Sequence, residues 1–350
     1  MCRISVDFFR DCYFRIVFER ELAEMKVSFV VPCYCSEATI KNVVAEIQKK
    51  MCVLSEYTYE IILVNDFSPD GTFEVIKELC DTDDRMIGID LAKNFGQHAA
   101  LMAGFQYISG DIVVCMDDDG QTPADEVEKL LYQLEDGYDV VYASYENKQH
   151  SPFRNFGSWI NSKMAESMLG KPDHLYISSY FAAKRFVIEE MKNYKNPYPY
   201  VIGLVLRTSQ HICNVTVSHR KREAGHSGYS FRKLFALWIN GFTSFSVKPL
   251  RIATISGIFV AIAGFIYAVW TIVKKITNPY VVIGWSSTVS IILIIGGMIL
   301  CVLGMIGEYV GRIYISINNS PQFVIRDLVC NKQKSVKVHH LEEENGIRVR

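Results

Sequence analysis

The chain has 350 residues, a formal net charge of −1 and 49% hydrophobic residues. This balance excludes binding to nucleic acid through overall charge, so no nucleic-acid partner is expected. The ten cysteines are scattered and form no C-x-x-C pair, which favours reduced thiols in a cytosolic domain over a disulfide framework or a cysteine metal site.

Residues 1–24 mix charged and aromatic residues without the uninterrupted apolar core of a signal peptide. Met25 stands directly before the first clear strand. One hypothesis is that translation begins at Met25 and that residues 1–24 are a mis-assigned extension. The other hypothesis is that this segment is a short amphipathic helix lying on a membrane surface.

From Lys26 onward, predicted strands alternate with predicted helices. Apolar runs indicate strands over residues 27–32, 60–66, 86–91, 111–117 and 139–144. Helical patterns indicate helices over residues 36–50, 72–80, 97–107 and 123–135. This alternation predicts an α/β domain with an open, mostly parallel sheet, spanning residues 25–230.

Polar side chains follow four of the five predicted strands. They are Tyr34 and Glu37, Asn65 and Asp66, Lys93 and Asn94, and Asp117–Asp119. In open α/β sheets, ligands bind at the carboxyl ends of the strands, so these side chains predict one common site. No G-x-G-x-x-G follows the first strand and no P-loop is present, which disfavours dinucleotide and P-loop chemistry.

The carboxylates of this set form a D-x-D pattern directly after an apolar strand. Asp117 and Asp119 have the spacing to share one cation, and hard oxygen ligands favour Mg²⁺ or Mn²⁺. The competing interpretation is a solvated acidic turn before the helix that begins near Pro123.

Two long charge-free segments follow, at residues 252–273 and 280–307. Their length predicts a transmembrane hairpin, against the alternative of buried helices in a soluble protein. Glycines in the second segment suit close helix packing and favour a homo-oligomer. Residues 231–251 combine aromatic and basic residues and predict an interfacial amphipathic helix, or alternatively a core helix. Residues 308–350 are then a C-terminal tail, and the basic flanks place both ends of the hairpin in the cytoplasm.

Three motifs carry a resemblance to a known family. VVPCYCSE (residues 30–37), LVNDFSPDGT (63–72) and MDDDGQTP (116–123) resemble family 2 glycosyltransferases, which have a GT-A-like nucleotide-diphospho-sugar transferase fold. KNFGQHAALMAGF (93–105) and REAGHSGYSFRKL (222–234) resemble its polyprenyl-phosphate glycosyltransferase branch. That branch includes bactoprenol glucosyltransferases, undecaprenyl-phosphate 4-deoxy-4-formamido-L-arabinose transferases and dolichyl-phosphate sugar synthases.

The resemblance implies roles for particular residues. Asp117, Asp119 and Gln121 would be catalytic, with Asp119 and Asp117 holding the metal. The nucleotide sugar would be bound by Pro32, Tyr34, Glu37, Asn65, Asp66, Lys93 and Asn94. The lipid phosphate would be bound by Arg220, Arg222, Ser227 and Tyr229. Departures from the family pattern are Cys35 for the usual Asn, Asn65 for Asp, Phe67 for Gly and Gly120 for Leu.

The expected function is inverting transfer of one sugar from a nucleotide-diphospho-sugar, with UDP-sugars as the first candidates, to polyprenyl phosphate. The enzyme would be a multi-pass protein of the inner (plasma) membrane with its catalytic domain in the cytoplasm. Residues 176–185, YISSYFAAKR, offer no carboxylate as a catalytic base, but a phosphate acceptor is already an oxyanion and needs none. Two alternatives are transfer to a hydroxyl of a lipid-linked oligosaccharide or glycolipid, and a catalytically silent scaffold that binds nucleotide sugar.

Overall fold

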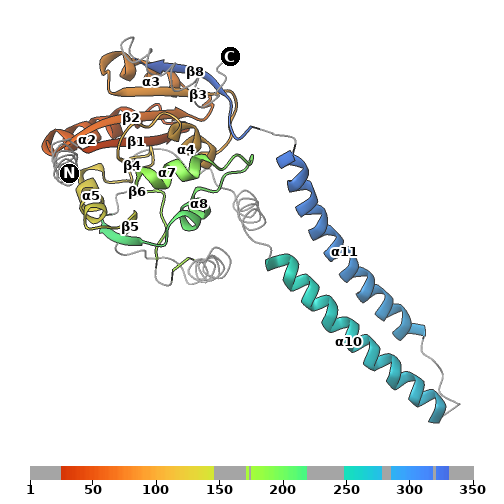
Figure 1. Cartoon of the computed structure of the whole chain (residues 1–350). Coiled ribbons are helices and arrows are strands. Elements are labelled where there is room, and N and C mark those ends of the chain that lie inside the picture. Colours follow the sequence, from red (N-terminus) through yellow and green to blue (C-terminus); the bar gives the residue numbers. More distant parts are fainter. Residues whose placement is uncertain are drawn as a thin grey trace, which may run out of the picture. The chain divides into compact units, whose positions relative to one another are not determined.

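The structure is a computed structural model, and it describes residues 25–145, 171–172, 175–218, 248–277, 285–317 and 321–330 (Figure 1). The described residues form two compact units. One unit is an α/β domain that includes the segment after residue 320, and the other contains the two long helices. The extension at residues 1–24 and most of the predicted 231–251 helix lie outside the described residues.

The α/β unit is built on a sheet in which eight strands are described, in the order β7-β5-β6-β4-β1-β2-β3-β8. The strands are β1 (Met25–Cys33), β2 (Tyr57–Asn65), β3 (Met86–Leu91), β4 (Ile112–Cys115), β5 (Val140–Tyr145), β6 (Phe181–Lys184), β7 (Ile212–Val217) and β8 (Ile325–Cys330). Neighbours β4, β1, β2 and β3 pair in parallel, whereas β6 and β8 run antiparallel to their partners. The prediction of a mostly parallel sheet is confirmed.

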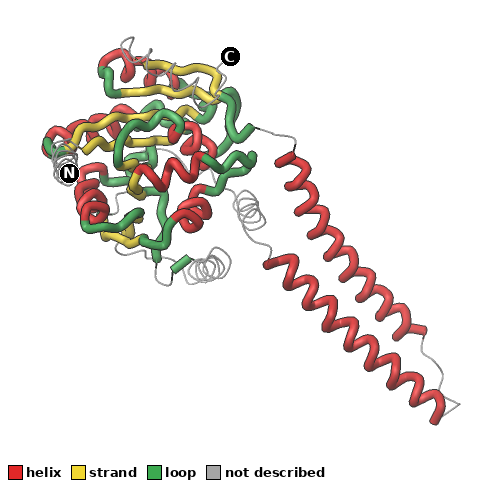
Figure 2. The backbone as a smooth tube through the Cα atoms, viewed as in Figure 1, coloured by secondary structure: helices red, strands yellow, loops and turns green. Residues whose placement is uncertain are grey.

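Helices cover both faces of the sheet, as Figure 2 shows in red against the yellow strands. They are α2 (Ile40–Val53), α3 (Thr72–Thr82), α4 (Gln97–Phe105), α5 (Val127–Glu135), α7 (Arg185–Lys192) and α8 (Val201–Thr208), with a 3-10 turn, η1 (Ala124–Glu126), before α5. Both faces of the central strands are therefore buried, which explains why their sequences are continuous apolar runs.

The sheet face under α4 shows how tightly these layers pack. A Cβ added to Gly104 would lie 2.5 Å from Cγ1 of Val30 and 3.1 Å from Cγ2 of Val64. Glycine is therefore required at this position for the helix to lie against β1 and β2.

Near the amino-terminal ends of these strands, a buried carboxylate links β2 to β1 and to the segment before β4. Glu60 in β2 is 2% exposed and accepts hydrogen bonds from Lys26 Nζ at 2.7 Å, Ser28 Oγ at 2.8 Å and the Ser109 amide at 2.6 Å. Burial alone would raise the pKa of Glu60, but these donors outweigh it and lower that pKa. The network fixes the amino-terminal edge of the sheet.

Three strands were not predicted from the sequence: β6, β7 and β8. Strand β6 has only four residues, FAAK, and β8 carries Arg326 and Asp327, so neither has the pattern of a buried strand. Strand β8 lies inside the segment 308–350 that was predicted to be a tail. Its pairing with β3 returns the chain to the sheet after the long helices.

The helical unit contains α10 (Lys248–Thr277) and α11 (Trp285–Ile317), both longer than the predicted 252–273 and 280–307 spans. Within the described residues, one stretch is long and apolar enough to cross a membrane, Ile294–Gly311 in α11, with a mean hydropathy of 1.9. A shorter apolar stretch, Gly257–Tyr267, lies in α10. A second span in α10 stays a prediction.

Candidate active site

The carboxyl ends of β1 and β4 are joined by Asp118. Its Oδ2 accepts a hydrogen bond from the Tyr34 amide at 2.9 Å and a short one from Ser36 Oγ. Burial raises the pKa of Asp118, and these two donors oppose that rise. Asp118, the middle aspartate of the triplet, therefore holds the loop after β1.

The loops after β1 and β2 are also tied to each other. The Cys35 amide donates to Ser68 Oγ at 3.1 Å, and the Ser36 amide donates to Thr72 Oγ1 at 2.9 Å. Glu37 Oε2 accepts from the Gly71 amide at 2.9 Å. This carboxylate thus organises the turn that starts α3.

Two residues of these loops have left-handed backbone conformations, Cys35 with φ 57° and Phe67 with φ 55°. These are the positions where the family pattern has Asn and Gly, the residues that tolerate this conformation best. Cys35 and Phe67 therefore adopt this conformation at a conformational cost.

Asp66 connects β2 to the loop after β3. Its carboxylate accepts hydrogen bonds from the Phe95 amide at 2.7 Å and the Gly96 amide at 2.8 Å, and its carbonyl accepts one from Asn94 Nδ2 at 3.2 Å. Burial raises the pKa of Asp66 while the two amides oppose that rise. The loop that leads into α4 is thereby held beside the carboxylates after β4.

Asp117 lies at the centre of the site. Its Oδ1 accepts a hydrogen bond from Gln97 Nε2 at 2.9 Å, and its Oδ2 accepts a short one from Ser179 Oγ. Burial, followed by the charges of Asp119 and Asp118, raises the pKa of Asp117 from 3.8 to about 6, against the two hydrogen bonds. An ionised carboxylate in this position is unfavourable unless a cation compensates for it.

This donor set fits the expected metal. Asp119 stands two residues further along, and its Oδ1 accepts a hydrogen bond from the Gln121 amide at 3.1 Å. Within the described residues, no three His, Cys, Asp or Glu side chains form a metal-binding group. Mg²⁺ and related ions are commonly held by one or two carboxylates together with substrate phosphates, so a pair of aspartates is sufficient.

The remaining predicted residues differ in their surroundings. Pro32 is buried inside β1, in register with Val64. Lys93 is exposed, with Nζ 4.9 Å from the centroid of the Phe95 ring. Asn65 is buried and donates to Asp90 Oδ1 at 2.7 Å. The four residues predicted to bind lipid phosphate, Arg220, Arg222, Ser227 and Tyr229, lie outside the described residues.

Three contributors were not predicted from the sequence: Ser36, Gln97 and Ser179. Ser179 precedes β6, and because β6 runs antiparallel to β4 its first residues lie next to the end of β4. No local pattern marks a single serine for this role. The structure thus has a serine, not a carboxylate, donating to Asp117 from this segment.

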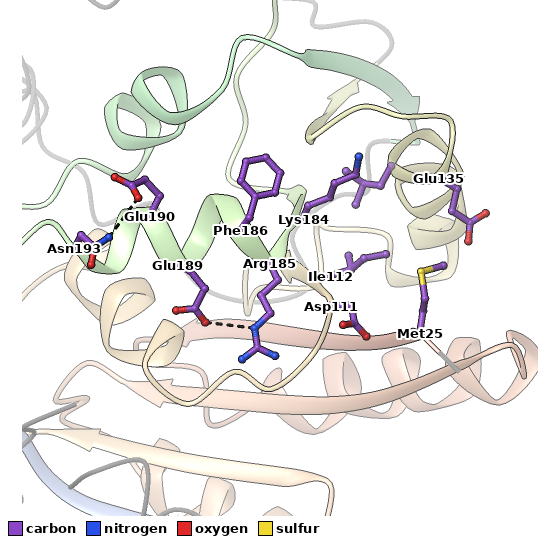
Figure 3. A pocket seen from close by; sticks show the side chains of 11 residues that line it. Met25, Asp111, Ile112, Glu135, Lys184, Arg185, Phe186, Glu189, Glu190 and Asn193 are labelled. Atoms are coloured by element: carbon purple, nitrogen blue, oxygen red, sulfur yellow. Dashed lines mark hydrogen bonds and ion pairs between the residues drawn. The ribbon is translucent and has the colours of Figure 1, made fainter. Parts of the chain in front are cut away.

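A cavity of about 760 Å³ lies elsewhere, at the amino-terminal end of β4 (Figure 3). It is lined by residues around the start of β4 and α7, such as Asp111 and Arg185. Arg185 is paired there with Glu189 at 3.4 Å and donates to the Ser109 carbonyl at 3.1 Å. The cavity contains none of the residues from the carboxyl ends of β1 to β4, so we do not assign the chemistry to it.

The fold and these linked strand ends define an α/β enzyme of the nucleotide-sugar transferase type. Residues 28–192 match the family described as Glycosyl transferase family 2, and residues 248–313 match the GtrB C-terminal hairpin. The undecaprenyl-phosphate 4-deoxy-4-formamido-L-arabinose transferase of Proteus mirabilis is 33% identical over 88% of this chain and 95% of its own. An uncharacterized glycosyltransferase of Bacillus subtilis is 31% identical over 86% and 94%.

Solved structures include glucosyl-3-phosphoglycerate synthase from Mycobacterium tuberculosis, in complexes that hold Mn²⁺ and UDP-glucose. It is 20% identical, covers 63% of this chain and 78% of its own, and has a TM-score of 0.47. Given the curated relatives, the chain belongs to glycosyl transferase family 2, and it is a glycosyltransferase.

Proposed function

We propose that this enzyme transfers one sugar from a nucleotide-diphospho-sugar, with UDP-sugars as the first candidates, to a polyprenyl phosphate. The observation that carries the proposal is the carboxylate pair Asp117 and Asp119 at the point where four strands and their loops are cross-linked. A pair of carboxylates of this kind suits a diphosphate only when a divalent cation is bound with it. The name of the Proteus mirabilis relative supports undecaprenyl phosphate as the acceptor.

Asp117 and Asp119 would hold Mg²⁺ or Mn²⁺ together with the diphosphate of the donor. When bound, the cation supplies positive charge that stabilises the departing nucleoside diphosphate. Tyr34 and the residues of the loop after β2 would bind the nucleoside. Asp118 holds the loop after β1, and the amides of Cys35 and Ser36 tie the loop after β2 to it. Gln121 would lie beside the sugar.

The acceptor phosphate carries its own nucleophilic oxygen. It would form a bond to the anomeric carbon while the bond to the nucleoside diphosphate breaks, and a single displacement inverts the configuration. Ser179 beside Asp117 cannot act as a strong base at neutral pH, which agrees with an acceptor that needs no deprotonation. Arg220 and Arg222 would hold the phosphate through charge-assisted hydrogen bonds.

We further propose that α10 and α11 form a membrane hairpin. Large apolar side chains on both helices are exposed, with Phe259 74% and Leu300 70% accessible, whereas helices of a soluble core bury such residues. Basic flanking residues support an inner-membrane, multi-pass enzyme whose catalytic domain is cytoplasmic. The glycines of α11 support a homo-oligomer within the membrane.

The test is transfer of radiolabelled sugar from a panel of UDP- and GDP-sugars to undecaprenyl phosphate by the full-length protein. Assays run with Mn²⁺, with Mg²⁺ and with EDTA. Asp119→Ala is expected to lower the rate by at least about 100-fold, the usual scale for loss of an electrostatic contact in the transition state. Asp125→Ala, at an exposed aspartate six residues away, is the matched control and should retain the wild-type rate.

A chloroform-soluble product that requires metal and Asp119 would support the proposal. Transfer to a glycolipid hydroxyl without any product on undecaprenyl phosphate would favour the second acceptor class. Binding of nucleotide sugar without turnover on either acceptor would favour the silent scaffold and refute the proposed activity.

A further inference from the structure

An exposed aromatic ring and an exposed cation stand together beside the predicted donor site. Phe67, directly after Asn65 and Asp66, is 44% exposed. The guanidinium carbon of Arg326, from β8, lies 5.4 Å from the centroid of its ring. The two residues are 259 positions apart in sequence, and only the pairing of β8 with β3 brings them together.

The arginine is held in one orientation by a buried carboxylate. Asp90 in β3 is 0% exposed and accepts a hydrogen bond from Arg326 Nε at 2.5 Å and a shorter contact from Nη2. The same carboxylate accepts from Asn65 Nδ2, whose Oδ1 in turn accepts from the Ser68 amide at 3.2 Å. A chain of hydrogen bonds therefore connects Arg326 to the loop that carries Phe67.

The arginine side chain is nevertheless 54% exposed. A guanidinium has five N–H donors, and the carboxylate of Asp90 engages two of its nitrogens. A side chain that is fixed on one side and open on the other is suited to contact a ligand without a large loss of conformational freedom.

The backbone departs from regular structure at Arg326 and at Phe67. Asp90 is in register with Asp327 and Leu91 with Ile325, so Arg326 is the extra residue of a β-bulge. Bulges are frequent next to active sites, where they redirect a side chain. Phe67 holds φ 55°, a conformation that is unfavourable for a bulky residue and that persists at functional sites.

We propose that Phe67 and Arg326 recognise the base of the donor nucleotide, so that the strand after the second long helix determines donor specificity. This inference rests on the proposed function. The base would stack on the Phe67 ring, and the open N–H groups of Arg326 would donate to its carbonyl oxygens. Uracil has two such oxygens and adenine has none, so the pair favours uridine nucleotides over adenosine nucleotides.

The test measures binding of UDP, ADP and inorganic pyrophosphate to the full-length protein in nanodiscs with Mn²⁺, by isothermal titration calorimetry. Wild-type protein is expected to bind UDP at least about 10-fold more tightly than ADP. Phe67→Gly should weaken UDP binding about 10-fold, the scale of one lost stacking contact, and leave pyrophosphate binding unchanged. Arg326→Lys, which keeps the pair with Asp90, should reduce the preference for UDP over ADP several-fold.

Two controls accompany these variants. Phe67→Tyr retains the ring and should retain UDP affinity. Phe186→Leu changes another exposed aromatic, 52% accessible, in α7 near the amino-terminal end of β4, and should leave the binding of UDP, ADP and pyrophosphate unchanged. Melting temperatures are measured for all variants. Phe67→Gly leaves the ion pair of Asp90 and Arg326 intact, so its effect cannot come from loss of that pair.

Unchanged UDP and ADP binding in both Phe67→Gly and Arg326→Lys would overturn the inference while the proposed function stands. Equal loss of UDP and pyrophosphate binding would also overturn it, because the effect would then not concern the base. If the wild-type protein bound neither nucleotide nor pyrophosphate, the proposed function itself would fail, and the inference with it.

Discussion

Replacing Asp117 with asparagine should stabilise the protein while it abolishes sugar transfer. In the folded domain, burial and the neighbouring aspartates raise the pKa of this carboxyl from 3.8 to about 6. The shift of about 2 units corresponds to about 3 kcal/mol of unfavourable ionisation at neutral pH. Asparagine removes the charge but also weakens the hydrogen bonds from Gln97 and Ser179, so the expected net gain is about 1–2 kcal/mol.

The sign of the pH dependence follows from the direction of the shift. The folded state binds the proton of Asp117 more tightly than the unfolded state, so this group favours folding at low pH. Its stabilising contribution is lost as the pH rises from about 4 to about 6. The advantage of Asp117→Asn should therefore be absent below about pH 4 and complete above about pH 6.

The assay is thermal unfolding of the full-length protein with EDTA, followed by intrinsic fluorescence between pH 4 and pH 8. For a domain of this size, the gain corresponds to a rise in Tm of about 2–8 °C at pH 7.5. Asp125→Asn, at an exposed position, should not change the Tm. Added Mn²⁺ and UDP should raise the Tm of the wild-type protein and not that of the variant. A lower Tm for Asp117→Asn, or a difference that does not vary with pH, would refute the argument.

Three further predictions concern the structure around the site. Glu60→Gln should lower the free energy of unfolding by about 2 kcal/mol at pH 7, because the ion pair with Lys26 is lost. Urea denaturation should show this deficit shrinking as the pH falls through the lowered pKa of Glu60, below 4.5. Gly104→Ala should cost about 1–3 kcal/mol, since its Cβ would lie 2.5 Å from Val30; an unchanged denaturation midpoint would contradict this packing. Asp118→Ala should raise the KM for the donor about 10-fold with a smaller effect on kcat, because it releases the loop that carries Tyr34; a loss confined to kcat would contradict this positioning role.

The sequence predicted the parts of this enzyme that depend on local pattern. Continuous apolar runs predicted β1 to β5, because strands with both faces covered need apolar residues at every position. The motif 116–123 predicted Asp117 and Asp119 at the end of one of these strands. The parallel arrangement then implied that the polar residues after successive strands would meet.

The tertiary structure decided which of these residues form hydrogen bonds with residues from distant segments of the chain. Asp118 and Asp66 hold loops, and Ser179 reaches Asp117 only because β6 runs antiparallel beside β4. These contacts join residues that lie 29 to 84 positions apart, and no periodicity of the chain records such distances.

The contribution of Arg326 is the clearest case. In the sequence it is a basic residue after a long apolar segment, which indicates membrane topology and nothing else. In the fold it pairs with the buried Asp90 from 236 positions away. Local sequence therefore determined the elements and the acidic centre, whereas long-range strand pairing decided which side chains surround that centre, because pairing depends on the whole sheet and not on any one segment.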